Sequence, residues 1–293
     1  MSRAVAAAYL ACVLIWGTTW FAIRMSITAY PTYAAVALRF AIAVVILLPL
    51  AVRARAWPRG RVWGWLVLAG ALDAIGYLLV YLGEERVSGA VGAVLYGTHP
   101  LMLAILLTAT RIERLSRRHV FGAVISLGGV AVLFLDRLDV SPRQATGVAM
   151  VIGSVLVTTV YATIMKQKTQ GLNNLVATAI FLTVTAIVLG AVALAAGDPI
   201  PWPPPLRPTL ALLYLAIVGS VVAFLCYFWL LEKTSLQITS TLVFVYPLVA
   251  ILVDARFEHE LPLGPRAYLG AAITLSGLAI SLLRRSDVSR AAA

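Results

Sequence analysis

Long apolar stretches recur ten times along this chain of 293 residues, and short polar breaks separate them. A helix that crosses a bilayer needs about 20 apolar residues, because each residue rises about 1.5 Å through a hydrocarbon core of about 30 Å. Only 12% of the residues are charged, whereas soluble domains have about 25%, so lipid must surround much of the chain. We therefore expect an all-α integral membrane protein with ten transmembrane helices, near residues 5–23, 33–52, 62–82, 88–110, 117–135, 144–166, 173–196, 208–231, 236–255 and 264–283.

The breaks between these stretches have the composition of loops. Basic clusters occupy residues 53–61 and 111–118, and five prolines lie within residues 199–205. A proline run of this kind cannot form a helix and fits an aqueous or interfacial loop. Because the basic residues lie between apolar spans, the formal charge of +11 indicates membrane topology, and we expect no nucleic-acid partner.

The distribution of Lys and Arg predicts the orientation of the chain. If the N-terminus is cytoplasmic, fifteen of these residues fall in cytoplasmic segments and seven in outer loops. Cytoplasmic loops of membrane proteins carry the excess of basic residues. We therefore expect a multi-pass protein of the inner (plasma) membrane with both termini in the cytoplasm.

An internal repeat relates the two halves of the chain. Residues 81–102 align with residues 228–249 at a constant offset, and after an insertion of one residue, 121–134 align with 269–282. The aligned pairs are Glu85 with Glu232, Ser88 with Ser235, Pro100 with Pro247, Glu113 with Glu260, Gly122 with Gly270, and Gly129 with Gly277.

The repeat predicts two halves, 1–136 and 144–283, with five spans each. An odd number of spans inverts the second half in the membrane. Inverted repeats are typical of secondary transporters, which bind substrate near the midplane where the halves meet. We therefore expect two inverted five-helix repeats around a central cavity.

Aromatic and polar side chains deep in the spans are candidates to line such a cavity. Tyr77 and Tyr81 are four residues apart and share a helix face, and His99 is polar at membrane depth, which favours a functional role. Helix packing or an interfacial belt are the alternatives for the aromatic residues. The predicted substrate-binding residues are Trp16, Tyr77, Tyr81, Tyr96, His99 and Tyr161.

Two prolines and two charges complete the candidate site. Pro100 and Pro247 lie within spans four and nine, where they break or kink the helix and so are candidates for gating. Arg39 and Asp73 are ionisable residues well inside spans two and three, at similar depth. An ion pair between them would lower the cost of burying both, and proton transport by Asp73 is the alternative.

No cofactor or metal is expected. Cys12 and Cys226 lie in apolar spans, without the spacing of a metal site or a disulfide framework. The chain has no nucleotide-binding GxxxxGK[ST] loop, and no HExxH motif or paired aspartates occur in the spans. These patterns argue against ATP-driven transport and against an intramembrane enzyme.

Several runs resemble the EamA pattern of the drug/metabolite transporter (DMT) superfamily. They are LIWGTTWFAIR (14–24), ALRF (37–40) and YGTHPLMLAILLTATRIERLSRRHVFGAVISLGGV (96–130). Within the superfamily, VYATIMKQKTQGLNN (160–174) and YGTHP (96–100) are most similar to exporters of aromatic amino acids. Those exporters have a bulky ring where this chain has His99. The resemblance implies two inverted five-helix halves and a central cavity that opens alternately to each side.

The resemblance also implies export of aromatic and other neutral amino acids, so we expect a transporter that exports these or related small metabolites by alternating access. Its expected partners are the small-molecule substrate and the lipid bilayer, with the chain as a monomer or homodimer. A nucleotide-sugar transporter is the close alternative, although such anions would favour several cations in the cavity and only Arg39 is deep. An intramembrane enzyme or a receptor is the alternative of another class.

Overall fold

The computed structural model describes residues 2–110, 117–134, 141–234, 239, 242–257 and 264–282. Within these ranges every regular element is a helix. Six of the described helices are long and apolar enough to cross a membrane, and shorter apolar helices accompany them. The described helices fall in all ten expected stretches, so the prediction of an all-α integral membrane fold is confirmed. Glu113 and Glu260, which the repeat pairs, lie outside the described residues.

The first half of the chain contains six helical segments. They are α1 (Arg3–Ile27), α2 (Thr32–Ala54), α3 (Val62–Glu84), α4 (Gly89–Tyr96), α5 (His99–Ala109) and α6 (Arg117–Phe134). Ser2 and Ser88 cap the N-termini of α1 and α4, since their side chains accept hydrogen bonds from backbone N–H groups three residues on.

The second half continues with α7 (Pro142–Lys168), α8 (Asn174–Ala196), α9 (Leu206–Ala216), the π-helical segment η2 (Ile217–Val222), α10 (Ala223–Lys233), α12 (Leu242–Phe257) and α13 (Pro265–Leu282). The stretch from α9 to α10 is continuous, and η2 is a local widening within it. A π-helical turn inside an α-helix often marks a functional position.

The two repeat-related prolines differ in their effect. Pro100 lies in the first turn of α5, directly after the interruption of span four at Gly97 and Thr98. Pro247 lies inside α12, which continues through it. A helix interruption is therefore present at Pro100, whereas α12 is not interrupted at Pro247. The reason is that a membrane helix can tolerate a proline where neighbouring groups satisfy the freed carbonyl. The gating role of both prolines stays a prediction.

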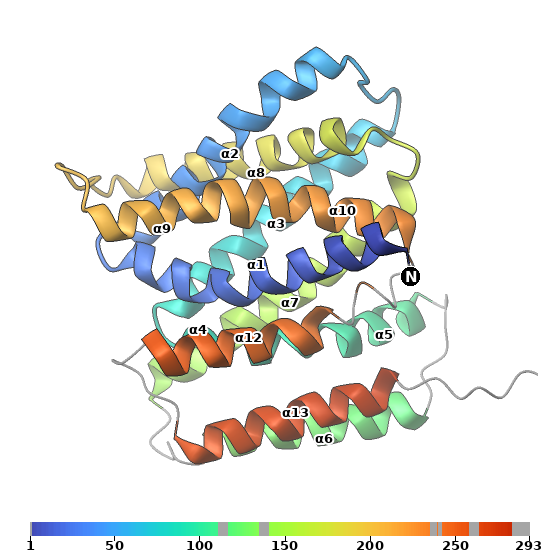
Figure 1. The fold of residues 1–293 in the computed structure, drawn as a ribbon, viewed down its shortest axis with the longest axis vertical. Coiled ribbons are helices and arrows are strands. Elements are labelled where there is room, and N and C mark those ends of the chain that lie inside the picture. Colours follow the sequence, from blue (N-terminus) through green and yellow to red (C-terminus); the bar gives the residue numbers. More distant parts are fainter. Residues whose placement is uncertain are drawn as a thin grey trace, which may run out of the picture.

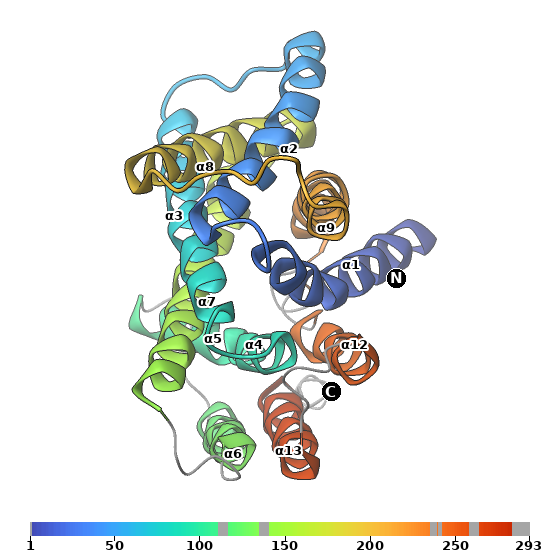
Figure 2. The same ribbon diagram turned by 90° about the vertical axis from the view of Figure 1, so that its left-hand side faces the viewer.

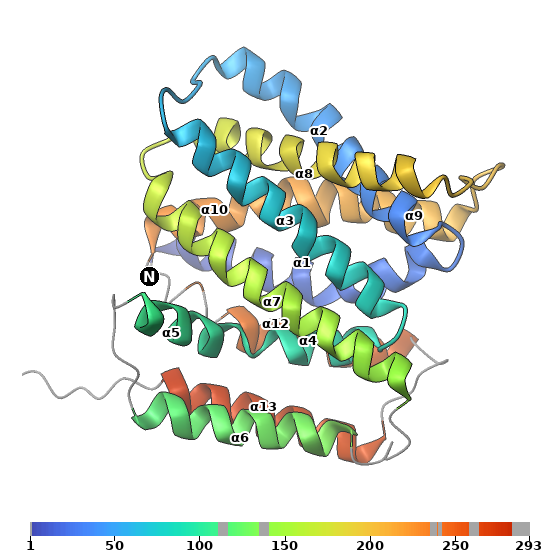
Figure 3. The same cartoon turned by 180° about the vertical axis from the view of Figure 1, so that it is seen from behind.

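The helices pack as a bundle with a distinct pair at one end. Figure 2, seen nearly along the helix axes, shows α3 and α7 facing α1 and α9, with α4 and α12 below them. In Figures 1 and 3, α6 and α13 lie side by side at the end of the molecule farthest from α2.

The α6–α13 pair has the geometry of a pseudo-twofold contact. The Ser126 hydroxyl donates to the Thr274 carbonyl at 3.1 Å, and the Thr274 hydroxyl donates to the Ser126 carbonyl at 3.3 Å. The two hydrogen bonds are therefore reciprocal, as expected where two repeats meet across a twofold axis.

Two glycines make this contact possible. A Cβ added to Gly129 would lie 2.4 Å from the Thr274 nitrogen, and one added to Gly277 would lie 2.6 Å from the Gly122 carbonyl oxygen. As the residue number rises along α6, the number of its neighbour in α13 falls, so the helices are antiparallel. This is the direction that inverted halves require, and small residues are what allow membrane helices to approach so closely.

We predict that Gly129→Ala lowers the free energy of unfolding by about 1–3 kcal/mol, because the added methyl group would collide with backbone atoms of α13. The neighbouring Gly128 has no atom within 4 Å of an added Cβ, so Gly128→Ala is the matched control and should leave stability unchanged or raise it. Thermal melts followed by size-exclusion chromatography in detergent measure both. Equal stability of the two variants would contradict this packing.

Candidate functional site

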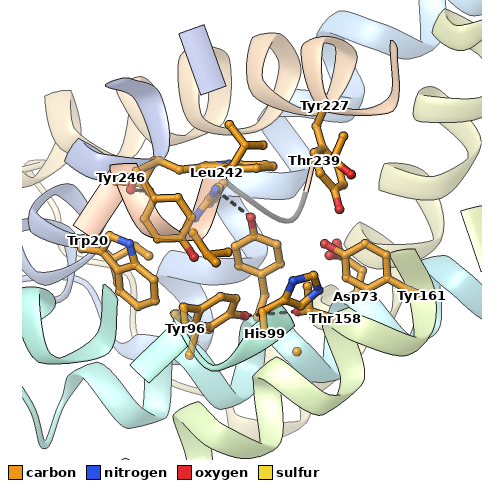
Figure 4. A pocket seen from close by; sticks show the side chains of 18 residues that line it. Trp20, Asp73, Tyr96, His99, Thr158, Tyr161, Tyr227, Thr239, Leu242 and Tyr246 are labelled. Atoms are coloured by element: carbon orange, nitrogen blue, oxygen red, sulfur yellow. Dashed lines mark hydrogen bonds between the residues drawn. The ribbon is translucent and has the colours of Figure 1, made fainter. Parts of the chain in front are cut away.

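A cavity of about 90 Å³ lies between the two halves (Figure 4). Side chains from α1 to α5 of the first half and from α7, α10 and α12 of the second half line it together. Of the predicted site residues, seven line this cavity: Trp16, Arg39, Asp73, Tyr77, Tyr96, His99 and Tyr161. The structure therefore brings together residues that are separated by up to 145 positions in the sequence.

Tyr81 is the one predicted aromatic residue that does not line the cavity. Its side chain is fully buried in the helix bundle, with Arg39, Glu84 and Ser26 as electrostatic neighbours. Four residues along an α-helix correspond to about 6 Å of rise and about 40° of rotation. Val80, the residue before Tyr81, does line the cavity. Rotation about the helix axis, and not height along it, therefore turns Tyr81 away from the cavity wall.

Aromatic rings in edge-to-face contact form much of the wall. Trp16 and Tyr227 have ring centroids 5.0 Å apart at 64°, and Trp20 and Tyr96 have centroids 5.2 Å apart at 66°. This geometry is favourable because the positive edge of one ring meets the negative face of the other. A Cβ on Gly92 of α4 would lie 2.7 Å from the Trp20 ring. The absence of a side chain at Gly92 therefore leaves room for this ring.

The predicted site omits several lining residues that a closer use of the repeat could have found. Trp20 is four residues after Trp16, and Tyr246 precedes Pro247 just as His99 precedes Pro100. Tyr227 has no comparable signal in the sequence. The other lining residues outside the prediction are Thr19, Ile23, Gly76, Val80, Thr158, Thr239, Leu242 and Val243.

Arg39 is anchored to the π-helical segment of the other half. Its Nε donates to the Ser220 hydroxyl at 2.9 Å and its Nη2 donates to the Gly219 carbonyl at 3.0 Å. The guanidinium also lies 4.6 Å from the ring centroid of Tyr77, a cation–π contact. Nη1 is buried and has no hydrogen-bond partner in the described part of the chain.

Asp73 is held from α8. Its Oδ2 accepts a hydrogen bond of 3.0 Å from the Thr185 hydroxyl, while Oδ1 is buried and has no hydrogen-bond partner among the described residues. Within the same residues no salt bridge joins Asp73 to Arg39. The expected direct ion pair is therefore absent from this conformation, because Ser220, Gly219 and Thr185 hold the two groups instead. Both still line one cavity and interact electrostatically.

His99 is a buried polar group at the start of α5. Its side chain is 6% exposed, and neither ring nitrogen has a hydrogen-bond partner within the described ranges. Figure 4 shows it between Tyr96 and Tyr161, near Thr158. The Tyr96 hydroxyl, by contrast, is hydrogen-bonded to Ser154 and, at 3.2 Å, to Thr158 of α7. A buried group without a partner is costly, and such groups concentrate at functional positions.

Comparison with known families shows which family the chain belongs to. The profile of the EamA-like transporter family matches the chain twice, over residues 3–135 and again over 145–283. The chain belongs to the EamA-like transporter family. The two matches correspond to the two inverted five-helix repeats expected from the sequence.

Relatives of this EamA-like transporter span nearly its whole length. The "Uncharacterized inner membrane transporter YedA" of Escherichia coli (strain K12) is 27% identical over 86% of this chain and 82% of its own. A "Probable terminal-alkyne amino-acid exporter" of Streptantibioticus cattleyicolor is 24% identical over 99% of this chain and 96% of its own. One solved structure, titled only as a crystal structure of a protein, has a TM-score of 0.68 at 19% identity, and covers 96% of this chain and 97% of its own. That likeness supports the fold.

Two basic side chains of this EamA-like transporter bind the ends of wall helices in equivalent ways. Arg24 at the end of α1 donates to the carbonyls of Glu84 and Val87, at and just beyond the end of α3. Lys166 at the end of α7 donates to the carbonyls of Leu231 and Thr234, at the end of α10. The repeat pairs Glu84 with Leu231 and Val87 with Thr234.

We call these two contacts the Arg24 clamp and the Lys166 clamp. Cations that bind the last carbonyls of a helix also interact favourably with the helix dipole. Because the halves are inverted, the clamps lie at opposite ends of the bundle (Figures 1 and 3). Each clamp joins two helices that contribute side chains to the cavity.

We predict that His99→Phe keeps the EamA-like transporter folded but changes its transport rate by roughly 2- to 10-fold, the effect of removing one hydrogen-bonding group from a substrate. Stability should be unchanged or higher, since the nitrogens have no partner to lose. Melting temperature in detergent and transport rate in proteoliposomes measure the two effects. Unchanged transport would remove His99 from the site, and a large loss of stability would show that its nitrogens are satisfied within the protein.

Proposed function

We propose that this chain exports aromatic and other neutral amino acids, or related small metabolites, by alternating access through the central cavity. The observation that carries the proposal is the composition of the cavity wall. One cationic group, Arg39, and one carboxylate, Asp73, lie among at least six aromatic rings. A neutral amino acid carries one negative and one positive group next to an apolar side chain, so its charges and surface match this wall.

The same composition argues against the alternative substrates. A nucleotide sugar or sugar phosphate carries two negative charges and would require several cations to leave water. Arg39 is the one Arg or Lys among the described residues that line the cavity, and Asp73 would repel an anion. The relative named as an amino-acid exporter is consistent with this choice of substrate class.

The proposal includes the location and the arrangement of the chain. The excess of basic residues in alternate loops supports cytoplasmic termini, and the relative named as an inner membrane transporter supports that membrane. The halves 1–136 and 144–283 would act as the two moving units, and the break at Pro100 would serve as a hinge in the cavity wall. We propose a monomer or a homodimer as the transporting unit.

The size of the cavity supports a cycle between conformations. At about 90 Å³ it is smaller than the roughly 150 Å³ of an engineered protein cavity that holds benzene. An amino acid with an aromatic side chain would therefore need the cavity to widen. The Arg24 clamp and the Lys166 clamp are both closed here, and we propose that release of one or the other accompanies opening to each side.

We predict that the purified protein in proteoliposomes exchanges labelled neutral amino acids in a counterflow assay. Aromatic and aliphatic amino acids, sugars, nucleotides and nucleotide sugars form the test panel, and empty liposomes are the control. The balanced charge of the cavity favours exchange of the amino acids alone. Exchange of nucleotide sugars without any amino acid would refute the proposed substrate class.

We predict that opening either clamp shifts the access of the cavity in opposite directions. Arg24→Ala should favour opening at the outer end and Lys166→Ala at the cytoplasmic end, each by about tenfold, because two charge-assisted hydrogen bonds are lost. A cysteine at Val243, in a chain without Cys12 and Cys226, reports access through its reaction with an impermeant thiol reagent applied from each side.

Lys168→Ala is the matched control for the clamp experiment. Lys168 ends the same helix as Lys166 but lies over the Trp65 ring at 5.4 Å, away from the α10 carbonyls. Its removal should leave access unchanged. A shift in the same direction for Arg24→Ala and Lys166→Ala would contradict the proposed role of the clamps.

A further inference from the structure

We propose that Arg39 and Asp73 divide the recognition of a zwitterion, with Arg39 binding its carboxylate and Asp73 its ammonium group. This inference rests on the proposed function and names the chemistry by which the cavity selects its substrate. It depends on a feature that the two side chains share. Each is held in place on one side by the protein, and each retains one buried atom that has no hydrogen-bond partner among the described residues.

The guanidinium of Arg39 is fixed by two anchors. Nε and Nη2 bind the Ser220 hydroxyl and the Gly219 carbonyl of η2, and the plane of the group lies against Tyr77. These contacts satisfy two of its three nitrogens and leave Nη1 with no hydrogen-bond partner in the described chain. A guanidinium whose position is already set loses little freedom when it binds a carboxylate.

The carboxylate of Asp73 is arranged in the same way. Thr185 occupies Oδ2, since its hydroxyl donates there at 3.0 Å, and Oδ1 lacks a partner among the described residues. The Tyr161 side chain lies beside the carboxylate (Figure 4). A carboxylate accepts hydrogen bonds only, and an ammonium group is a donor only, so Oδ1 is suited to an ammonium group.

The absence of a salt bridge between Arg39 and Asp73 favours a role in substrate binding over a purely structural one. If Arg39 and Asp73 were present only to stabilise the bundle, the cheapest solution in a membrane would be a direct ion pair. They are instead tied to η2 and to α8, and line the same cavity without a salt bridge. A bound zwitterion would supply the missing partner of each group at the same time.

The wall also predicts where the substrate side chain lies. In Figure 4, Asp73 and Tyr161 lie at one side of the cavity, and Trp20 and Tyr246 lie at the other. With its ammonium group at Asp73, an amino acid would direct its side chain toward Trp20 and Tyr246. Aromatic rings tolerate both aliphatic and aromatic groups, so this part of the cavity would accept a range of neutral side chains.

A series of compounds with one phenyl ring tests the inference in the unmodified protein. Phenylalanine carries both charges, phenethylamine carries only the ammonium group, and 3-phenylpropionate carries only the carboxylate. We expect phenylalanine to compete in counterflow at least about tenfold better than either analogue, because each analogue leaves one buried charge without its partner. Equal competition by all three compounds would overturn the inference.

Two variants assign the roles. Asp73→Asn should reduce the preference for phenylalanine over 3-phenylpropionate by about tenfold, and Arg39→Gln should reduce the preference over phenethylamine by the same factor. Each variant should leave the other preference largely intact. Glu232→Gln is the matched acid-to-amide control, since Glu232 lies at the end of α10 in a surface ion pair with Lys233 and should change neither preference.

The outcomes separate this inference from the proposed function. Transport of phenylalanine without discrimination against the analogues, or preferences unchanged in Asp73→Asn, would overturn the inference and leave amino-acid transport standing. Transport of no amino acid would end both. If Arg39→Gln fails to fold because α2 loses its anchor on η2, then the unmodified protein and Asp73→Asn decide the question.

Discussion

The burial of one positive and one negative side chain in an apolar bundle is the constraint on which the centre of this protein depends. A charge at membrane depth must find partners, because lipid offers none. Arg39 finds them in the π-helical segment of the opposite half, and Asp73 finds one in Thr185. These contacts tie α2 to η2 and α3 to α8. The same contacts hold the two charges without a salt bridge between them, in the wall of one cavity.

The rest of the bundle supports this centre. The glycine contact between α6 and α13 brings the halves together at one end of the molecule, where the two backbones are in close contact. Around the cavity the walls are large aromatic rings, which cannot pack as closely as glycine and alanine. The Arg24 and Lys166 clamps bind backbone carbonyls at the ends of helices that line the cavity. Close backbone packing and the cavity thus lie in different parts of the helix bundle.

Sequence reasoning recovered much of this arrangement and missed particular parts of it. Apolar length predicted the helices, and residue depth predicted that Arg39, Asp73 and His99 lie at the centre. Spacing along one helix failed for Tyr81, because residues four apart still differ by about 40° around the helix axis, and the cavity meets only part of that helix face. Similar depth failed to predict the partners of Arg39, because a helix in the other half supplies them.

The sequence by itself determined that the chain spans a membrane, that its helices number ten, and that its halves are inverted copies. Those properties follow from apolar length, from repeat register and from an odd span count, all of which are local or additive. Only the tertiary structure decided which side chains share the cavity, where η2 widens the helix, and which atoms of Arg39, Asp73 and His99 have no hydrogen-bond partner among the described residues. Such properties depend on contacts between segments that are distant in the sequence. The spacing of residues along one helix does not show which other helix packs against it.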